Sequence, residues 1–220
     1  MAKDILTLLQ KKFISAISGN KKICDAFYLT GGTALAAYYL KHRYSEDLDF
    51  FSRAEIDTLS INVFLKWLKP VLGTRKIDFQ QSFNRNLFFL HTAHEILKTE
   101  FTYFPFELIE KPGKRDGVYI NSIIDIAVDK AFTISQNPRA RDFIDLYLIL
   151  KKYKELSFEK LLKMARAKFD WQIDPIQLGT QLLKAKDLKD LPRMIQKIDN
   201  SEWRRFFMDK SKSLSKDIFK

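Results

Sequence analysis

The spacing of apolar residues differs between the middle and the second half of the chain, and this difference limits the folds that the sequence allows. Between Arg75 and Tyr103, three segments alternate apolar and polar residues, namely "RKIDFQQSF", "NLFFLHTA" and "EILKTEFTYF". Such alternation predicts half-buried β-strands, whereas the apolar residues after about residue 122 recur with helical spacing. We therefore predict an α+β protein in which a small mixed β-sheet with flanking helices precedes a C-terminal helical bundle.

The stretch "KPGKRDGVYINS" separates the two patterns and is rich in turn residues. We place the boundary between two lobes there, at 1–110 and 111–220. In the first lobe we predict short strands at "CDAFYLT" and "EDLDFF", and helices over 4–18, 34–41 and 56–69. In the second lobe we predict helices over 122–135, 139–153, 158–169, 176–186 and from 202 into the tail.

The composition excludes several classes of protein. No apolar stretch approaches the ~20 residues that cross a bilayer, and "MAKDILTLLQKKF" lacks the apolar core of a signal peptide. We therefore expect no membrane span and a cytoplasmic location. Because Cys24 is the only cysteine, the chain can form neither an internal disulfide nor a cysteine-based zinc site.

Positive charge is concentrated in the second half of the chain. The net charge is +11, and residues 111–220 contribute +9 of it, with 24 Lys and Arg against 15 Asp and Glu. Clustered cations favour a polyanionic partner, because they release counterions from phosphates. The alternative is a solvated surface that keeps the protein soluble, and charge alone does not decide between the two.

Two aspartates lie two residues apart in a predicted strand. Asp47 and Asp49 would point to the same face, while Leu48 between them points into the core. Two converging carboxylates repel each other, so a divalent cation is the natural compensating charge. Oxygen ligands suit Mg²⁺ or Mn²⁺ better than zinc.

Neighbouring residues suit the phosphates that Mg²⁺ binds. Gly31 and Gly32 let a phosphate approach the backbone, and the helix predicted after Thr33 would present free N–H groups. Glu100 lies on the more polar side of its predicted strand and is a candidate third acid for a two-metal site. The alternative for Glu100 is a cross-strand pair with a lysine.

The order of two motifs carries a family resemblance. "GGT" at 31–33 precedes "RYSEDLDFF" at 43–51, and Lys130 precedes "RDFIDL" at 141–146. In order and spacing over about residues 25–150, the chain resembles the DNA polymerase β-type nucleotidyltransferases, and more narrowly the AbiEii-like abortive-infection toxin family. Residues 151–220 carry no motif that we can assign.

The resemblance implies an enzyme with a nucleotidyltransferase core and a helical lobe that completes the nucleotide site. Such an enzyme moves a nucleoside monophosphate from an NTP to an acceptor hydroxyl as the toxin of a toxin-antitoxin pair. The implied acceptor is RNA, specifically tRNA, and an antitoxin protein is a further implied partner. The implied metal ligands are Asp47, Asp49 and Glu100, and Asp142 would serve the nucleotide or the chemistry. The implied nucleotide contacts are Gly31, Gly32, Thr33, Arg43, Ser45, Lys130, Arg141 and Asp145, with Lys130 on the triphosphate.

Two observations keep other interpretations open. The family commonly has an arginine seven residues after the lysine, where this chain has Asn137, and Arg139 would have to replace it. Arg141 and Asp145 are also spaced as an i,i+4 pair, so they could form no more than a charged helix face. The alternative functions are a degenerate protein that binds NTP without turnover, and a small-molecule nucleotidyltransferase of the antibiotic-modifying kind. The latter needs a compact acidic pocket for a cationic substrate.

Overall fold

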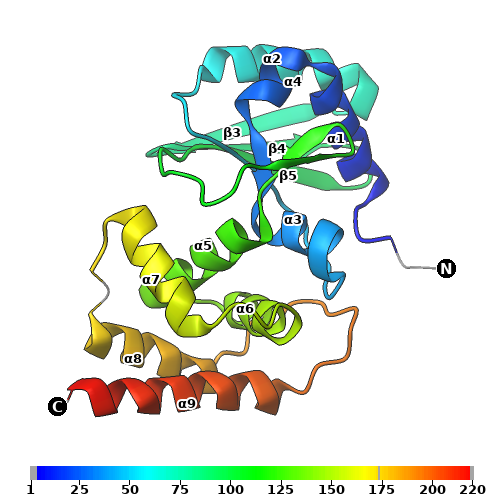
Figure 1. Ribbon diagram of the computed structural model, residues 1–220. Helices are drawn as coiled ribbons and strands as arrows, with labels where there is room; N and C mark the ends of the chain where they lie inside the picture. The colour runs from blue at the N-terminus through cyan, green and yellow to red at the C-terminus, as the bar shows by residue number, and fades with distance from the viewer. Residues whose placement is uncertain (1–3, 173, 219–220) are drawn as a thin grey trace. The chain divides into compact units, whose positions relative to one another are not determined.

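The computed structural model describes residues 4–172 and 174–218, which form two compact units (Figure 1). Unit 1 comprises residues 4–39 and 44–122, and unit 2 comprises residues 40–43 and the described residues from 123 onward. None of the helices in these described ranges combines the length and the apolar character that crossing a bilayer requires.

Within the described residues, unit 1 is built on a seven-stranded mixed sheet with the order β3-β4-β5-β2-β1-β7-β6. The strands are β1 Tyr28–Thr30, β2 Leu48–Ser52, β3 Lys76–Ser82, β4 Arg85–His91, β5 Ile96–Tyr103, β6 Gly113–Arg115 and β7 Val118–Ile120. The antiparallel pairs β3–β4 and β4–β5 confirm the predicted meander. The strand that carries the aspartates, β2, lies between β5 on one side, in parallel, and β1 on the other, antiparallel.

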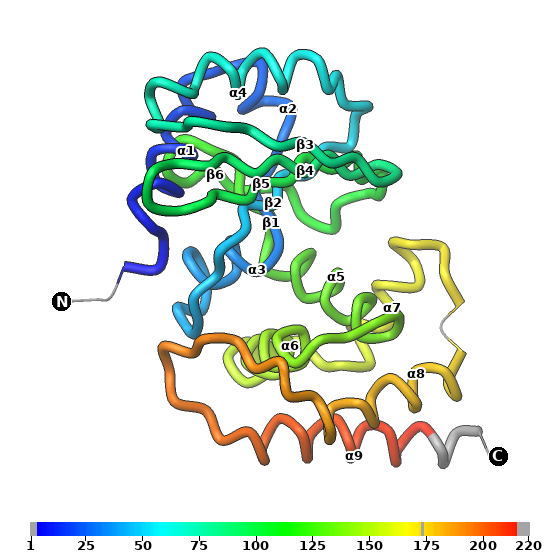
Figure 2. Tube along the Cα trace, turned by 180° about the vertical axis from the view of Figure 1, so that it is seen from behind, coloured from blue at the N-terminus to red at the C-terminus, as the bar shows by residue number. Residues whose placement is uncertain are grey.

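One face of this sheet is covered by three helices, α1 (Leu8–Gly19), α2 (Lys21–Ala26) and α4 (Thr58–Leu72) (Figures 1 and 2). On this face the Phe13 ring of α1 lies 6.1 Å from Phe50, which stacks on Phe101 at 5.4 Å between ring centroids. Because side chains alternate along a strand, Phe50 points toward the helices and Asp49 points to the opposite face.

Local signals explain where the helices of unit 1 differ from the prediction. The first part of "CDAFYLT" is helical rather than extended, because the Asn20 side chain accepts a hydrogen bond from Ile23 N and starts α2. After β1, α3 (Gly31–Ala34) passes into a π-helix over Leu35–Leu40. Pro70 lies inside the last turn of α4, which ends at Gly73 in the left-handed conformation.

The division between the units lies after Ser122 rather than at residue 111. The turn-rich stretch folds back as a hairpin of β6 and β7, and β7 pairs in parallel with β1, which joins it to the sheet. Residues Leu40–Arg43 belong to unit 2 although their neighbours in sequence belong to unit 1. Backbone hydrogen bonds hold them there, because Ile195 N and Gln196 N both donate to the His42 carbonyl, at 2.8 and 3.0 Å.

Unit 2 is the predicted helical bundle. Its elements are α5 Ile123–Gln136, α6 Ala140–Lys152, α7 Phe158–Phe169, α8 Pro175–Leu183, the short 3₁₀-helix Lys184–Lys186 and α9 Asn200–Ile218. α5 packs against α6, α7 and α8, and α9 packs against α6 and α8. The rings of Trp203 and Phe207 from α9 lie 6.1 and 4.8 Å from Phe143 of α6. Phe219 and Lys220, where the last helix was also predicted, lie outside the described residues.

Candidate functional site

The structure brings the three predicted acids of unit 1 to one face of the sheet, opposite the covering helices. Asp49 and Glu100 are direct partners in the parallel pairing of β2 and β5, so their side chains project side by side. Asp47 comes just before β2, and Lys98, two residues before Glu100, donates to Asp47 Oδ2 at 2.8 Å. A common face for these carboxylates follows from the sequence pattern and the strand register together.

Two side chains donate hydrogen bonds to Glu100. Arg85 Nε and Nη2 donate to the two carboxylate oxygens at 2.7 and 2.6 Å, and the Thr102 hydroxyl also donates to Oε1. Burial acts to raise the pKa of Glu100, but the hydrogen bonds from Arg85 and Thr102 outweigh it and hold that pKa below its ordinary value. Glu100 is therefore an ionised acid whose oxygens are already engaged.

Asp47 is held more loosely than Glu100. Its side chain is 28% exposed and that of Lys98 is 32% exposed. Half-exposed ion pairs of this kind contribute up to about 1 kcal/mol. Exchange of Lys98 for another cation at Asp47 would therefore cost little free energy.

Gly31 makes room for the second aspartate. Its φ is +69°, and a Cβ atom at this position would lie 2.5 Å from Asp49 Oδ2. A side chain here would meet both backbone strain and a collision with the carboxylate. The structure thus gives Gly31 a packing role against Asp49, and Gly32 follows it in α3.

The loop before β2 is anchored at three carbonyl oxygens. The buried Thr33 hydroxyl donates to the Asp47 carbonyl. Gln10 Nε2, on a side chain that is almost fully buried, donates to the carbonyls of Ser45 and Glu46 at 3.0 and 3.1 Å. Thr33, predicted as a phosphate contact, therefore positions Asp47, while Ser45 is half-buried.

Gln10 was missed by the sequence analysis. It forms a capping box with Thr7 at the start of α1, since Gln10 N donates to the Thr7 hydroxyl and Thr7 N donates to Gln10 Oε1. The T-x-x-Q spacing could have revealed this cap, but not the contact with the distant loop.

In unit 2, the predicted residues Arg43, Lys130 and Asp145 form one buried cluster together with His42. Arg43 Nε and Nη2 donate to the two oxygens of Asp145 at 2.7 and 2.8 Å, and Lys130 Nζ lies 2.9 Å from Oδ2. His42 Nε2 lies 2.7 Å from Asp145 Oδ1, and both side chains are fully buried. Burial acts to raise the pKa of Asp145, but Lys130 and Arg43 hold it well below its ordinary value.

Asp142 links this cluster to the start of α6. It accepts a hydrogen bond from Lys130 Nζ at 2.7 Å and another from Arg139 N at 3.0 Å, which caps the helix. Burial acts to lower the pKa of Lys130, but Asp145 and Asp142 raise it above its ordinary value. The cluster therefore keeps Lys130 charged.

Two other cations lie at the start of α6. Arg139 is exposed and Arg141 is half-buried, and neither forms an ion pair with any side chain in the described part of the chain. The i,i+4 pair of Arg141 with Asp145 is not formed, since Asp145 contacts Arg43 and Lys130 instead. The helix-face interpretation of this motif is thus not what the structure shows.

The donor chemistry of unit 1 fits a hard divalent cation in part. No group of three or more His, Cys, Asp or Glu side chains within residues 4–172 and 174–218 is arranged to hold a metal ion. Asp47 and Asp49 offer carboxylate oxygens, the ligands that Mg²⁺ and Mn²⁺ prefer. The ion pair of Asp47 with Lys98 is partly exposed, whereas both oxygens of Glu100 accept hydrogen bonds from Arg85. The residues present thus fit a cation held by the two aspartates.

Comparison with known proteins identifies the family of this chain. A sequence profile of the family described as "Nucleotidyl transferase AbiEii toxin, Type IV TA system" matches residues 16–217. An uncharacterized protein of Aquifex aeolicus (strain VF5) is 36% identical over 159 residues, which cover 69% of this chain and 71% of that protein.

Solved structures share the fold. Two structures from Helicobacter pylori superpose with TM-scores of 0.61 and 0.58 at 21% identity, each covering 95% of this chain and 92% and 90% of the other. The nucleotidyltransferase toxin MenT4 of Mycobacterium tuberculosis H37Rv superposes with a TM-score of 0.59 at 14% identity, covering 94% of this chain and 81% of that one. Since the family profile spans nearly the whole chain, the protein belongs to the AbiEii family of nucleotidyltransferase toxins.

Proposed function

We propose that this nucleotidyltransferase depends on a divalent metal ion and transfers the nucleoside monophosphate to a hydroxyl of RNA, with tRNA as the expected acceptor class. The observation that supports metal dependence most directly is the pair of carboxylates Asp47 and Asp49 on one face of the sheet, with Gly31 leaving room for the second. In the transfer, the acceptor hydroxyl gives up its proton to water and its oxygen bonds to the α-phosphorus, while the bond from that phosphorus to the bridging oxygen breaks and pyrophosphate leaves.

Asp47 and Asp49 would hold the cation, which stabilises negative charge on the phosphoryl oxygens and lowers the pKa of the acceptor hydroxyl. Mg²⁺ or Mn²⁺ suits such oxygen ligands. The chain's own residues prepare this arrangement: Thr33 and Gln10 fix the loop that carries Asp47. Arg85 keeps Glu100 ionised beside Asp49 and holds its carboxylate in place.

Lys98 is the cation of unit 1 that is best placed to contact phosphate. It lies on the same face as the carboxylates and is bound to Asp47 by a half-exposed ion pair. If Asp47 takes up a metal ion, the Lys98 ammonium gains a phosphate oxygen as its natural partner. The contact of Lys130 with the triphosphate, and the nucleotide roles of Arg43, Arg141, Asp142 and Asp145, stay predictions from the family resemblance.

The experiment that tests the metal site compares Asp47→Asn and Asp49→Asn with the matched control Glu46→Gln. Glu46 lies between Arg43 and Asp47 in the same motif but is exposed. With α-labelled NTP, Mg²⁺ and total RNA, each aspartate variant should lose at least about a hundredfold in transfer rate, since several kcal/mol of transition-state stabilisation is removed. Glu46→Gln should keep the wild-type rate.

All three variants should melt within about 2 °C of the wild type, because the aspartate side chains are partly exposed. Near wild-type transfer by either aspartate variant would show that these carboxylates do not hold a catalytic metal ion. Transfer by the wild type that persists in EDTA would refute metal dependence itself.

The excess positive charge of residues 111–220 supports RNA as the acceptor. To test this, basic side chains are needed whose charge can be reversed without disturbing the fold. Arg204 donates to the Leu188 carbonyl at 2.9 Å and lies over the Trp203 ring, so its reversal would disturb the fold, whereas Arg205 and Lys163 are exposed. The tail lysine Lys220 lies outside the described residues.

The double variant Arg205→Glu/Lys163→Glu should raise the apparent KM for RNA and leave that for NTP nearly unchanged. RNA affinity of the wild type should fall with salt with a log-log slope of about 0.7 per phosphate contact for a single strand. Arg75→Glu, an exposed reversal in unit 1, is the matched control. Label on a small molecule instead of RNA would favour the antibiotic-modifying class, and NTP binding without transfer to any acceptor would favour a degenerate protein.

A further inference from the structure

The outer side of α4 carries four exposed apolar residues in a row. Leu59, Val63, Trp67 and Val71 occupy every fourth position and are 72%, 59%, 66% and 53% exposed. The opposite side of the same helix already supplies the core of unit 1 through Ile61, Phe64, Leu65 and Leu68. A helix that only covers a sheet needs one apolar face. The second apolar face of α4 is therefore not required by the packing of unit 1, and exposed apolar patches of this kind mark interaction sites.

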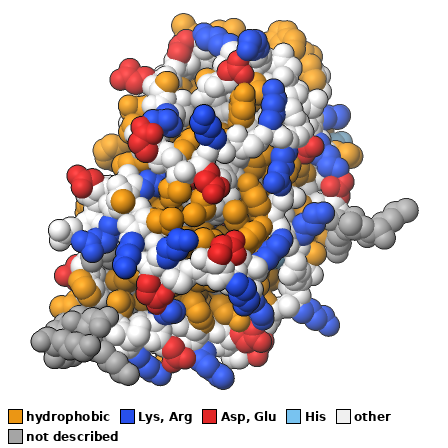
Figure 3. Space-filling view, viewed as in Figure 1, with side chains coloured by type: hydrophobic (Ala, Val, Ile, Leu, Met, Phe, Trp, Pro, Cys, Tyr) orange, Lys and Arg blue, Asp and Glu red, His pale blue; other side chains and the backbone are white. Residues whose placement is uncertain are grey.

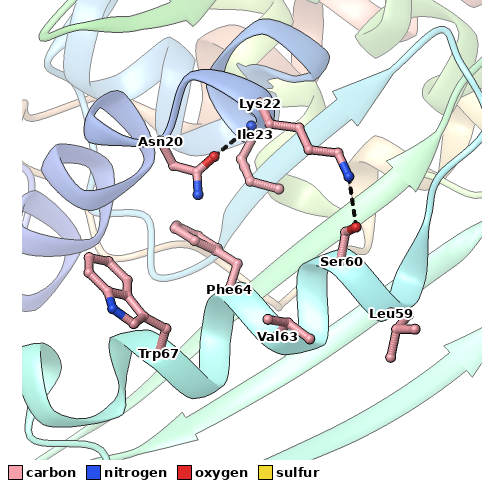
Figure 4. A pocket seen from close by; sticks show the side chains of 8 residues that line it. All are labelled: Asn20, Lys22, Ile23, Leu59, Ser60, Val63, Phe64 and Trp67. Atoms are coloured by element: carbon pink, nitrogen blue, oxygen red, sulfur yellow. Dashed lines mark hydrogen bonds between the residues drawn. The ribbon is translucent and has the colours of Figure 1, made fainter.

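A groove follows this row of residues between α4 and the pair α1–α2. One hollow of about 420 Å³ lies between α4 and α2, and Figure 4 shows Phe64 and Trp67 projecting from α4 toward Asn20 and Ile23. A second hollow of about 620 Å³ lies between α4 and α1, and both share Trp67 and Asn20. Trp67 thus borders both hollows, and we call the two together the groove of unit 1.

Lysines line the rim of the groove. Lys11, Lys12 and Lys22 contribute to its lining, and Lys66 is exposed on α4 next to Trp67. Lys12 and Lys66 form no ion pair with any described side chain, while Lys11 pairs with Asp4 and Lys22 lies 4.0 Å from Asp57. Along the upper edge of Figure 3, where Figure 1 places α4, hydrophobic side chains lie at the surface among basic and acidic ones.

The charge of the rim decides between two kinds of occupant. A second copy of this chain that used the same face would place lysines opposite lysines, because a two-fold interface brings identical patches together. A partner with acidic residues flanking an apolar stripe would instead complement both the groove and its rim. The stripe from Leu59 to Val71 spans about 18 Å at 1.5 Å per residue, the length of about three helical turns.

We infer that this groove is a docking site for an amphipathic helix of a partner protein, with apolar residues at i, i+4 and i+7 seated along Trp67 and acidic residues facing the lysines. Trp67 is the anchor of the interface, because large aromatic side chains in such grooves contribute most of the binding free energy. The site lies on the helix-covered side of the sheet, whereas Asp49 points to the other side. Docking is therefore a property separate from nucleotidyl transfer.

The test uses the full chain and a fluorescein-labelled synthetic helical peptide of about 18 residues with a leucine stripe flanked by glutamates. One control peptide has the same composition in scrambled order, and another has lysines in place of the glutamates. Binding is followed by fluorescence anisotropy at low and at raised salt. The glutamate peptide should bind, whereas the scrambled peptide should not. The lysine peptide should bind at least about tenfold more weakly than the glutamate peptide, and raised salt should weaken the binding of the glutamate peptide.

Two variants locate the site. Trp67→Ala and Val63→Asp should each weaken binding of the glutamate peptide by about tenfold or more. The matched control is Trp171→Ala, which removes another exposed tryptophan, 46% exposed and in unit 2, and should leave binding unchanged. Both groove variants should keep wild-type melting and transfer activity, because their side chains are exposed and outside the carboxylate face.

Three results would each overturn the proposal. The glutamate and lysine peptides could bind equally well, the glutamate peptide could fail to bind, or its affinity could be unchanged in both Trp67→Ala and Val63→Asp. Sedimentation of the wild type at high concentration tests whether a second copy of the chain fills the groove instead. A dimer that Val63→Asp dissociates would show that a second copy fills the groove, and the proposal of an acidic partner would fail.

Discussion

Replacing Asp145 by asparagine tests the buried charge cluster of unit 2. Asparagine keeps the size of the side chain but removes the negative charge opposite Arg43 and Lys130, whose side chains are only 3% and 11% exposed. Removing one partner from a buried ion pair costs about 3–5 kcal/mol, because the remaining charge stays buried without compensation. Asp142 still neutralises Lys130, at 2.7 Å, so the cost should lie at the lower end of that range.

The expected loss is large enough to measure by thermal unfolding. For a chain of this size, 1 kcal/mol shifts Tm by about 2–4 °C, so a loss of about 3 kcal/mol corresponds to about 6–12 °C. Circular dichroism at 222 nm follows the helices, most of which belong to unit 2 among the described residues. Glu155→Gln removes one negative charge from an exposed turn after α6 and serves as the matched control.

The pH dependence gives a second check on the same variant. The pKa of Asp145 is lowered in the folded state, so its contribution is fully present above the unfolded pKa of about 4 and is lost as pH falls through the folded pKa. The Tm difference between wild type and Asp145→Asn should therefore stay constant from about pH 8 to about pH 5 and shrink below about pH 4. A Tm loss no larger than that of Glu155→Gln, or a difference that grows in acid, would refute the reasoning.

Three further substitutions have definite expected outcomes. Gly31→Ala should lower the transfer rate at least about tenfold and destabilise the fold by about 1–3 kcal/mol, because the new Cβ would meet the Asp49 carboxylate. A variant with wild-type activity and wild-type Tm would contradict this prediction. Arg85→Met should raise the pKa of Glu100 and shift the pH–rate profile toward higher pH, and an unchanged profile would show that Arg85 does not tune this acid. Burial raises the pKa of Asp129 to about 6, so the folded state binds this proton more tightly than the unfolded state, and stability falls as pH rises from about 4 to about 6. Asp129→Asn should therefore remove this pH dependence, so that the Tm of the variant relative to the wild type rises between about pH 4 and about pH 6, and a Tm difference that stays constant over this range would contradict the prediction.

The meander and the shared face of the acids were predictable because both depend on a period of two. Alternation marks β3, β4 and β5, and it also sets Asp47 and Asp49 on one side of Leu48. The hairpin of β6 and β7 was missed because each strand has three residues and β6 is exposed throughout, so no alternation is visible.

The partners of the site residues were not predictable, because they are distant in sequence. Gln10 reaches the Ser45 carbonyl across 35 positions, and His42 reaches Asp145 across 103. Nothing in the local pattern of a glutamine or a histidine indicates such a contact. The contact of the Thr33 hydroxyl with the Asp47 carbonyl was not predictable for the same reason, and its predicted contact with a phosphate stays a prediction.

The placement of Leu40–Arg43 in unit 2 has a consequence for how the chain is made. The backbone passes between the units at residues 39–40, 43–44 and 122–123. During translation, His42 leaves the ribosome 103 residues before Asp145, an interval of about 5–20 s at ordinary elongation rates. A nascent chain can thus complete the sheet of unit 1 while His42 and Arg43 still lack the carboxylate that both contact in the folded protein. Expression of residues 123–220 alone would leave Asp145 without His42 and Arg43, so the helical bundle depends on four residues encoded near the start of the chain.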